Sequence, residues 1–220
     1  MSELGSYRLL LDEMEKWFRS ICVRYPDQMQ CARGCTLCCY GLFDVSLPDA
    51  VLVLEGMGKL PETTQNEIIE RATGLQRSIQ EAAPNLKTPF FLDTLSEEQI
   101  DQIVDLTNEP RCPFLSGRNQ CLIYECRPLA CRLEGIPMID VEDGLFDDWC
   151  ELNFINGVPS HAVKELKRDY ARIQEIEAGS TVLLSKKLLG RPSGRVTLFI
   201  PSLVVEFKGW WWKALGSREL

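Results

Sequence analysis

Apolar residues recur at alternating steps of three and four along the first 25 residues, which is the spacing of one face of an α-helix. The stripe is made of seven residues: Leu4, Tyr7, Leu11, Met14, Phe18, Ile21 and Tyr25. Pro26 follows at once, and proline cannot continue a helix. The pattern therefore predicts an amphipathic helix that ends before residue 26 and packs its apolar face on a core.

Three more helices are predicted between residues 46 and 106. Residues 46–49, Ser-Leu-Pro-Asp, have the form of a helix start, and the glycines of 56–58 mark its end. Pro61 opens a longer polar helix that Pro84 stops. Residues 96–99, Ser-Glu-Glu-Gln, form a capping box for a third short helix.

The last third of the chain predicts one long helix and an apolar end. The helix begins at Ser160 and continues past Gly179 to Leu189. Residues 195–213 are the most apolar part of the sequence, but Pro201 and nearby charges interrupt them, so the uninterrupted apolar runs are too short for a transmembrane span. We expect a terminal strand or segment that packs on the helices. Tryptophan beside lysine in 210–213 leaves open a contact with a protein partner or a membrane surface.

Together these elements predict a mainly α (α+β) fold, a single-domain helical scaffold around a cysteine cluster with a small β-hairpin. The expected division places the amphipathic helix in residues 1–30 and the cysteine-cluster core in 31–151. Residues 152–220 supply the C-terminal helix and the apolar segment that packs on this core.

Charge and cysteine content narrow the function. The formal net charge of -8 argues against a general nucleic-acid binder, since such proteins neutralise phosphates with Lys and Arg. The N-terminus has no basic region followed by a long apolar run, so no signal peptide is expected and a cytoplasmic location is the default expectation. Ten cysteines in such a chain indicate metal ligands or redox groups rather than disulfides.

Four cysteines fall within nine residues in the first cluster, at Cys31, Cys35, Cys38 and Cys39. Cys35 and Cys38 have the two-residue spacing common in zinc and iron–sulfur sites, and Gly34 suits a tight turn. The adjacent pair is harder to place on one metal because neighbouring side chains diverge. Two metal sites, one shared multinuclear site, or one ligand beside a packing or redox thiol all remain open.

The second cluster covers residues 112–132. Two short apolar runs that begin at Cys112 and Cys121 flank the turn residues 116–119, which predicts a hairpin that brings both thiols together. Pro128 fits the first turn of a short helix that carries Cys131. Cys126 lies five residues before Cys131, so the two thiols do not share a helix face, and Cys126 ranks below its neighbours as a ligand.

The surroundings of these thiols also bear on their chemistry. Four arginines stand against one glutamate in residues 111–132, and guanidinium groups would offset the negative charge of clustered thiolates. Cys150 lies in the acidic stretch 140–151, which is typical of a solvated loop. Because carboxylates surround it, this thiol is a debatable ligand. His161 is the only histidine and reads as a surface residue, so a metal must rely on sulfur.

With both clusters in view, the chain resembles the CxxCxxCC family, also called YkgJ-like, described as zinc- or iron-chelating proteins. The resemblance rests on residues 34–39, 112–115 and 121–132 and extends over 31–132. It implies a chelating set of eight thiols, enough for two four-sulfur sites or one larger cluster. These are Cys31, Cys35, Cys38, Cys39, Cys112, Cys121, Cys131 and Cys150.

Three functions are compatible with these residues. The first is a metal-binding protein that holds zinc or iron, with no assigned reaction. The second is an iron–sulfur enzyme or electron-transfer protein, since a relative of the family is similar to flagellin lysine N-methylases. Residues 31–38 also have the cysteine spacing of radical S-adenosylmethionine enzymes, although few strands are predicted for the barrel of such enzymes. The third is a thiol redox sensor.

Overall fold

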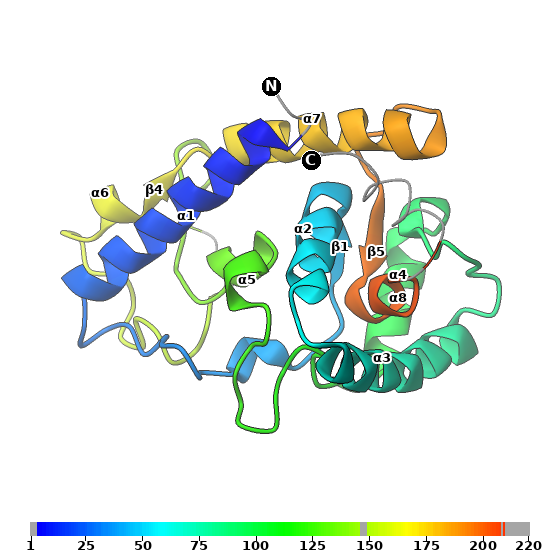
Figure 1. The fold of residues 1–220 in the computed structure, drawn as a ribbon. Coiled ribbons are helices and arrows are strands. Elements are labelled where there is room, and N and C mark those ends of the chain that lie inside the picture. Colours follow the sequence, from blue (N-terminus) through cyan, green and yellow to red (C-terminus); the bar gives the residue numbers. More distant parts are fainter. Residues whose placement is uncertain (1–3, 146–148, 208, 210–220) are drawn as a thin grey trace.

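The computed structural model describes residues 4–145, 149–207 and 209 (Figure 1). Eight α-helices lie within these residues: α1 Gly5–Arg24, α2 Leu47–Gly58, α3 Glu62–Ala82, α4 Glu97–Leu106, α5 Ala130–Leu133, α6 Val163–Leu166, α7 Tyr170–Leu189 and α8 Ile200–Val205. Short strands make up the β part: β1 Asp44–Ser46, β2 Ile139–Asp140, β3 Gly144–Leu145, β4 Lys167–Arg168 and β5 Thr197–Phe199. The mainly α prediction with a small β part is confirmed.

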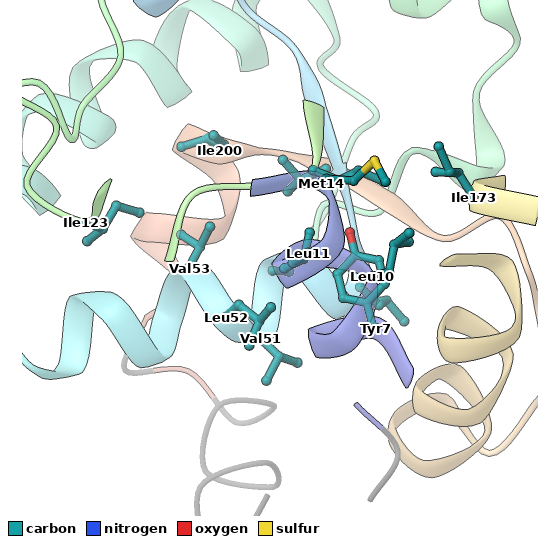
Figure 2. Packing of buried hydrophobic residues seen from close by; sticks show 14 of the residues in the cluster. Tyr7, Leu10, Leu11, Met14, Val51, Leu52, Val53, Ile123, Ile173 and Ile200 are labelled. Carbon is teal, nitrogen blue, oxygen red and sulfur yellow. The ribbon is translucent and has the colours of Figure 1, made fainter. Parts of the chain in front are cut away.

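Helix α2 is at the centre of the fold. Ten of its residues are buried, so the helix is enclosed on all sides rather than along one stripe. Helices α1 and α7 pack against each other on one flank, and α2 contacts α7 (Figure 1). Side chains from α1 and α2 meet in this core, as Tyr7, Met14, Val51 and Val53 show (Figure 2). Among the described residues, the larger of two clusters of buried side chains runs from Leu4 to Phe207, and a smaller one includes Leu42, Ile79 and Phe199.

The four helices predicted in the first half are present. α1 ends at Arg24. Its buried face also includes Leu10 and Trp17, which are not part of the apolar stripe predicted from the sequence. The capping box of α4 is formed, with the Ser96 hydroxyl accepting from the Gln99 N–H and the Gln99 side chain accepting from the Ser96 N–H. Local capping signals and apolar spacing therefore located these helices correctly.

Two small sheets connect distant parts of the chain. Strand β1 pairs antiparallel with β5 in the register Val45 to Leu198, which joins the start of α2 to the start of α8. In the other sheet β2 lies between β3, its antiparallel neighbour, and β4, its parallel neighbour. Asp140 of β2 is buried and accepts from the backbone N–H groups of Glu142, Asp143 and Tyr170, so this acid is not part of a solvated loop.

The helix predicted from Ser160 to Leu189 is two helices. α6 is a single turn, the chain then extends through β4, and Asp169 caps α7 by accepting from the Arg172 N–H. The break coincides with two tertiary contacts of Arg168. Its carbonyl oxygen accepts from the Val141 N–H, and its guanidinium lies over the Trp17 ring at 4.3 Å. These long-range contacts hold an extended segment that the apolar spacing did not reveal.

The hairpin predicted over 112–121 is a tight antiparallel turn with little strand. Leu115 and Cys121 form one isolated bridge, and the Ser116 N–H donates to the Gln120 carbonyl. Pro128 precedes α5 rather than lying in its first turn, because Leu129 is the N-cap. The turn lies where the sequence predicts it. The apolar runs on its two sides pack on the core instead of extending the antiparallel pairing between them.

The apolar C-terminal segment packs on the rest of the fold as far as it is described. β5 pairs with β1, and α8 lies along α3 (Figure 1). The tryptophans at 210–212, named as a candidate contact surface, lie outside the described residues. In the parts of the chain that the structure describes, no helix has both the length and the apolarity needed to cross a membrane.

Replacing Leu54 by Ala should lower the free energy of unfolding by about 2–5 kcal/mol, because the buried side chain leaves a cavity at the centre of α2. Urea unfolding followed by circular dichroism measures this change. Leu183→Ala is the matched control, since Leu183 is 52% exposed on α7 and its loss should cost no more than about 0.5 kcal/mol. Equal losses in both variants would contradict the central position of α2.

Candidate metal centre

The two cysteine-rich segments lie side by side, although more than seventy residues separate their beginnings. The Cys112 N–H donates to the Cys39 carbonyl at 2.8 Å, and the Gly41 N–H donates to the Pro110 carbonyl at 3.0 Å. Tyr40 and Arg111 form an antiparallel bridge between these two contacts. Backbone pairing thus brings the thiols of both segments to one place.

Seven of the eight predicted ligands line one cavity of about 100 Å³. They are Cys31, Cys35, Cys38, Cys39, Cys112, Cys121 and Cys131. Apolar side chains from four parts of the fold complete the wall, including Phe18 of α1, Phe114, Ile123 and Ile200 of α8. A largely apolar wall around several thiols favours ligation by sulfur over hydration of an ion.

Cys150, the eighth predicted ligand, does not line the cavity but lies next to Cys31. A Cβ atom placed on Gly135 would fall 2.9 Å from the Cys31 sulfur and 3.6 Å from the Cys150 Cβ. Gly135 also has a φ of +93°, a conformation that favours glycine. Only a residue without a side chain fits between these two cysteines.

The two remaining cysteines are placed apart from this arrangement. Cys22 is on α1 and packs against the core. Cys126 packs against α2, where a Cβ on Gly56 would fall 2.7 Å from its own Cβ. Neither residue lines the cavity, which agrees with their absence from the predicted set.

All ten cysteines are free thiols. Seven of them line the cavity without converging on one point: within residues 4–145, 149–207 and 209, no three His, Cys, Asp or Glu side chains form a group that could hold a metal ion. The donor chemistry nevertheless fits zinc or iron, because free thiols from two segments line one cavity.

Burial favours the protonated form of Cys31, Cys112 and Cys131. It raises the pKa of Cys31 to about 11 and that of Cys112 to about 12, and it raises the pKa of Cys131 well above its ordinary value. The Phe114 N–H and the Arg111 guanidinium lower the pKa of Cys112 and offset part of this effect. The thiols would therefore ionise only when a cation compensates the charge.

Cys38 connects the two segments electrostatically. A hydrogen bond with Cys39 is the largest cause that raises its pKa, and burial is the next. Its charge also raises the pKa of five other thiols, those of Cys31, Cys112, Cys121, Cys131 and Cys150. Cys38 therefore lies close enough to affect the pKa of thiols in both segments.

The arginines of the second cluster act mainly as structural cross-links. Arg127 and Arg132 both bind the Glu15 carboxylate of α1, at 2.9 and 2.8 Å, and both guanidinium groups are 7% exposed. Arg132 also donates to the Glu125 and Arg127 carbonyls. The expectation that arginines offset thiolate charge applies to Arg111, which lowers the pKa of Cys112, and to Arg127, which lowers that of Cys121, although burial has the larger effect on both thiols.

Asp49 of α2 is a buried acid that holds the same segment. Both Asp49 oxygens accept from the Leu129 N–H at 3.1 Å, which links α2 to the start of α5 and therefore to Cys131. Burial raises the pKa of Asp49 to about 7. Asp49 and Glu15 were not identified from the sequence, because an acid near an apolar stripe gives no local sign of a distant partner.

The family comparison agrees with the geometry. Residues 30–151 match CxxCxxCC, described as a "putative zinc- or iron-chelating domain". No curated protein and no solved structure gives a significant match to the chain. The matched range includes the eight predicted ligand cysteines and ends one residue after Cys150.

Glu15→Gln should destabilise the protein by about 3–5 kcal/mol, because two buried guanidinium groups lose their carboxylate. Urea unfolding of the metal-depleted protein isolates this effect from metal binding. Glu13→Gln provides the control, since Glu13 pairs with Arg172 at an exposed position and its loss should cost at most about 1 kcal/mol. If Glu15→Gln lowered the free energy of unfolding by no more than Glu13→Gln, the pairing of Glu15 with Arg127 and Arg132 would not be a structural cross-link.

Asp49 should make stability depend on pH. Its pKa is about 7 in the folded protein and about 4 in an unfolded chain, so its contribution is complete below pH 4 and is lost as pH rises to 7. Relative to Asp49→Asn, the wild type should lose up to about 1.4 kcal/mol per pH unit in this window. Urea unfolding of both metal-depleted proteins at several pH values measures the difference, and parallel pH profiles would contradict it.

Proposed function

Since the chain belongs to the CxxCxxCC family, we propose that it is a metalloprotein that holds zinc or iron through cysteine thiolates. The proposed ligands are Cys31, Cys35, Cys38, Cys39, Cys112, Cys121, Cys131 and Cys150. The observation that carries the proposal is the common cavity: free thiols from two segments distant in sequence line one space.

The type of donor supports zinc or an iron–sulfur cluster over harder ions. Thiolates are soft ligands, and magnesium and calcium instead require several oxygen donors. Among the described residues that line the cavity, only Glu134 carries a carboxylate. Zinc would give a closed, redox-silent centre, whereas an iron–sulfur cluster would give a centre able to transfer electrons.

The number of thiols supports more than one metal ion. Eight cysteines are enough for two four-sulfur sites or one larger cluster. Cys150 lies beside Cys31 at Gly135, whereas Cys112, Cys121 and Cys131 belong to the second cysteine segment. Either arrangement gives the adjacent Cys38 and Cys39 separate roles.

Metal and sulfide analysis of the anaerobically purified protein, with its visible absorption spectrum, tests the proposal. Zinc at a whole number per chain without colour indicates a structural or accessory centre. Iron with acid-labile sulfide and a brown chromophore indicates a cluster for electron transfer or enzymatic chemistry. A protein that binds neither metal after anaerobic reconstitution would contradict the proposal.

Cysteine variants test the ligand set directly. Cys112→Ser should lower the metal bound per chain and the thermal midpoint, because it removes a cavity thiol from the second segment. Cys22→Ser is the matched control, since Cys22 is outside the cavity and should leave metal content unchanged. If both variants kept the full metal content, the cavity would not be the binding site.

A further inference from the structure

Asn153 is buried beside the proposed centre and is not part of either cysteine segment. Its side chain is 0% exposed and makes three polar contacts. The Oδ1 atom accepts from the Gln30 N–H at 2.7 Å, while Nδ2 donates to the Gly135 carbonyl at 2.6 Å and to the Cys31 sulfur at 3.0 Å. The amide side chain therefore joins its own segment to residues 30–31 and to Gly135.

The orientation of this amide follows from its partners. A backbone N–H can only donate, so Gln30 requires the carbonyl oxygen of Asn153 on its side. A backbone carbonyl can only accept, so Gly135 requires the NH₂ group on the other side. The second hydrogen of this NH₂ group then points at the Cys31 sulfur.

The backbone around Asn153 is also held in place. Its N–H donates to the Cys150 carbonyl at 2.9 Å, and its carbonyl accepts from the Trp149 indole at 2.9 Å. The following residue, Phe154, donates its N–H to the Gln28 carbonyl at 2.8 Å. The segment that carries Cys150 is thereby fixed against the segment that leads into Cys31.

We propose that Asn153 is a positioning residue of the metal centre, which orients Cys31 and stabilises its thiolate by an N–H···S hydrogen bond. This inference rests on the proposed function, because it requires Cys31 to be a ligand. Hydrogen bonds to ligand sulfurs tune metal affinity and, in iron–sulfur centres, the reduction potential. Asn153 lies beyond residues 30–151, the range that the family matches.

The Asn153→Asp variant tests the role. Aspartate has nearly the same shape and can still accept from the Gln30 N–H, but it presents an oxygen in place of a donor to both the Cys31 sulfur and the Gly135 carbonyl. Its zinc or iron affinity, measured by competition with a chromophoric chelator, should fall about 10–100-fold. Asn66→Asp makes the same charge change at an exposed position of α3 and should leave the affinity within twofold of wild type.

A double-mutant comparison separates positioning of Cys31 from general support of the fold. In a Cys31→Ser background, adding Asn153→Asp should change metal affinity less than twofold, because the sulfur on which it acts is already gone. Should Asn153→Asp lose its cooperative unfolding transition, Asn153→Ala, which removes the donor without burying a charge, carries the same comparison.

Two results would overturn the inference. One is a metal affinity in the Asn153 variants equal to that of Asn66→Asp. The other is an equal loss of metal affinity when Asn153 is replaced in the wild type and in the Cys31→Ser background. Either result would leave the proposed function standing, provided the unmutated protein binds zinc or iron. An unmutated protein that binds neither metal would instead refute the proposed function itself.

Discussion

The partly buried Glu15 carboxylate holds helix α1 against the segment that carries Cys121 and Cys131. Helix α1 supplies this acid and also Phe18 of the cavity wall, whereas Arg127 and Arg132 belong to the segment that carries Cys121 and Cys131. Breaking a buried pair leaves uncompensated charge, so the two guanidinium groups hold their segment against α1. Because both also bind backbone carbonyls around residues 124–131, the same contact shapes the loop that presents the thiols.

Helix α2 completes this support from inside the molecule. Asp49 binds the Leu129 backbone, and Gly56 leaves room for Cys126, so the second cluster is held by contacts from two different helices. The first cluster is held mainly by backbone pairing with the second and by Asn153. The thiols can therefore be irregular in local structure, since their positions are set by the surrounding helices and polar contacts.

Burial and apolar walls give the cavity its chemical character. Several thiols whose pKa values are raised by burial are stable there as neutral groups, and ionising one of them without a cation would bury a negative charge. A divalent metal reverses this balance because it compensates the thiolates it binds. The arginines beside the cavity offset less thiolate charge than their number suggests, because two of them already bind Glu15 and backbone carbonyls.

The sequence by itself determined the first four helices, the cysteine-rich character of the site and its family, because apolar spacing, caps and cysteine spacing are local signals. Tertiary structure decided where the chain departs from those signals. Residues 167–169 extend because Arg168 contacts Trp17 and residue 141, and the apolar runs beside residues 116–119 pack on the core rather than form a ladder. Glu15, Asp49 and Asn153 gained their roles only in the folded chain, since each acts on residues at least eighteen positions away, and no local pattern encodes such a distant partner.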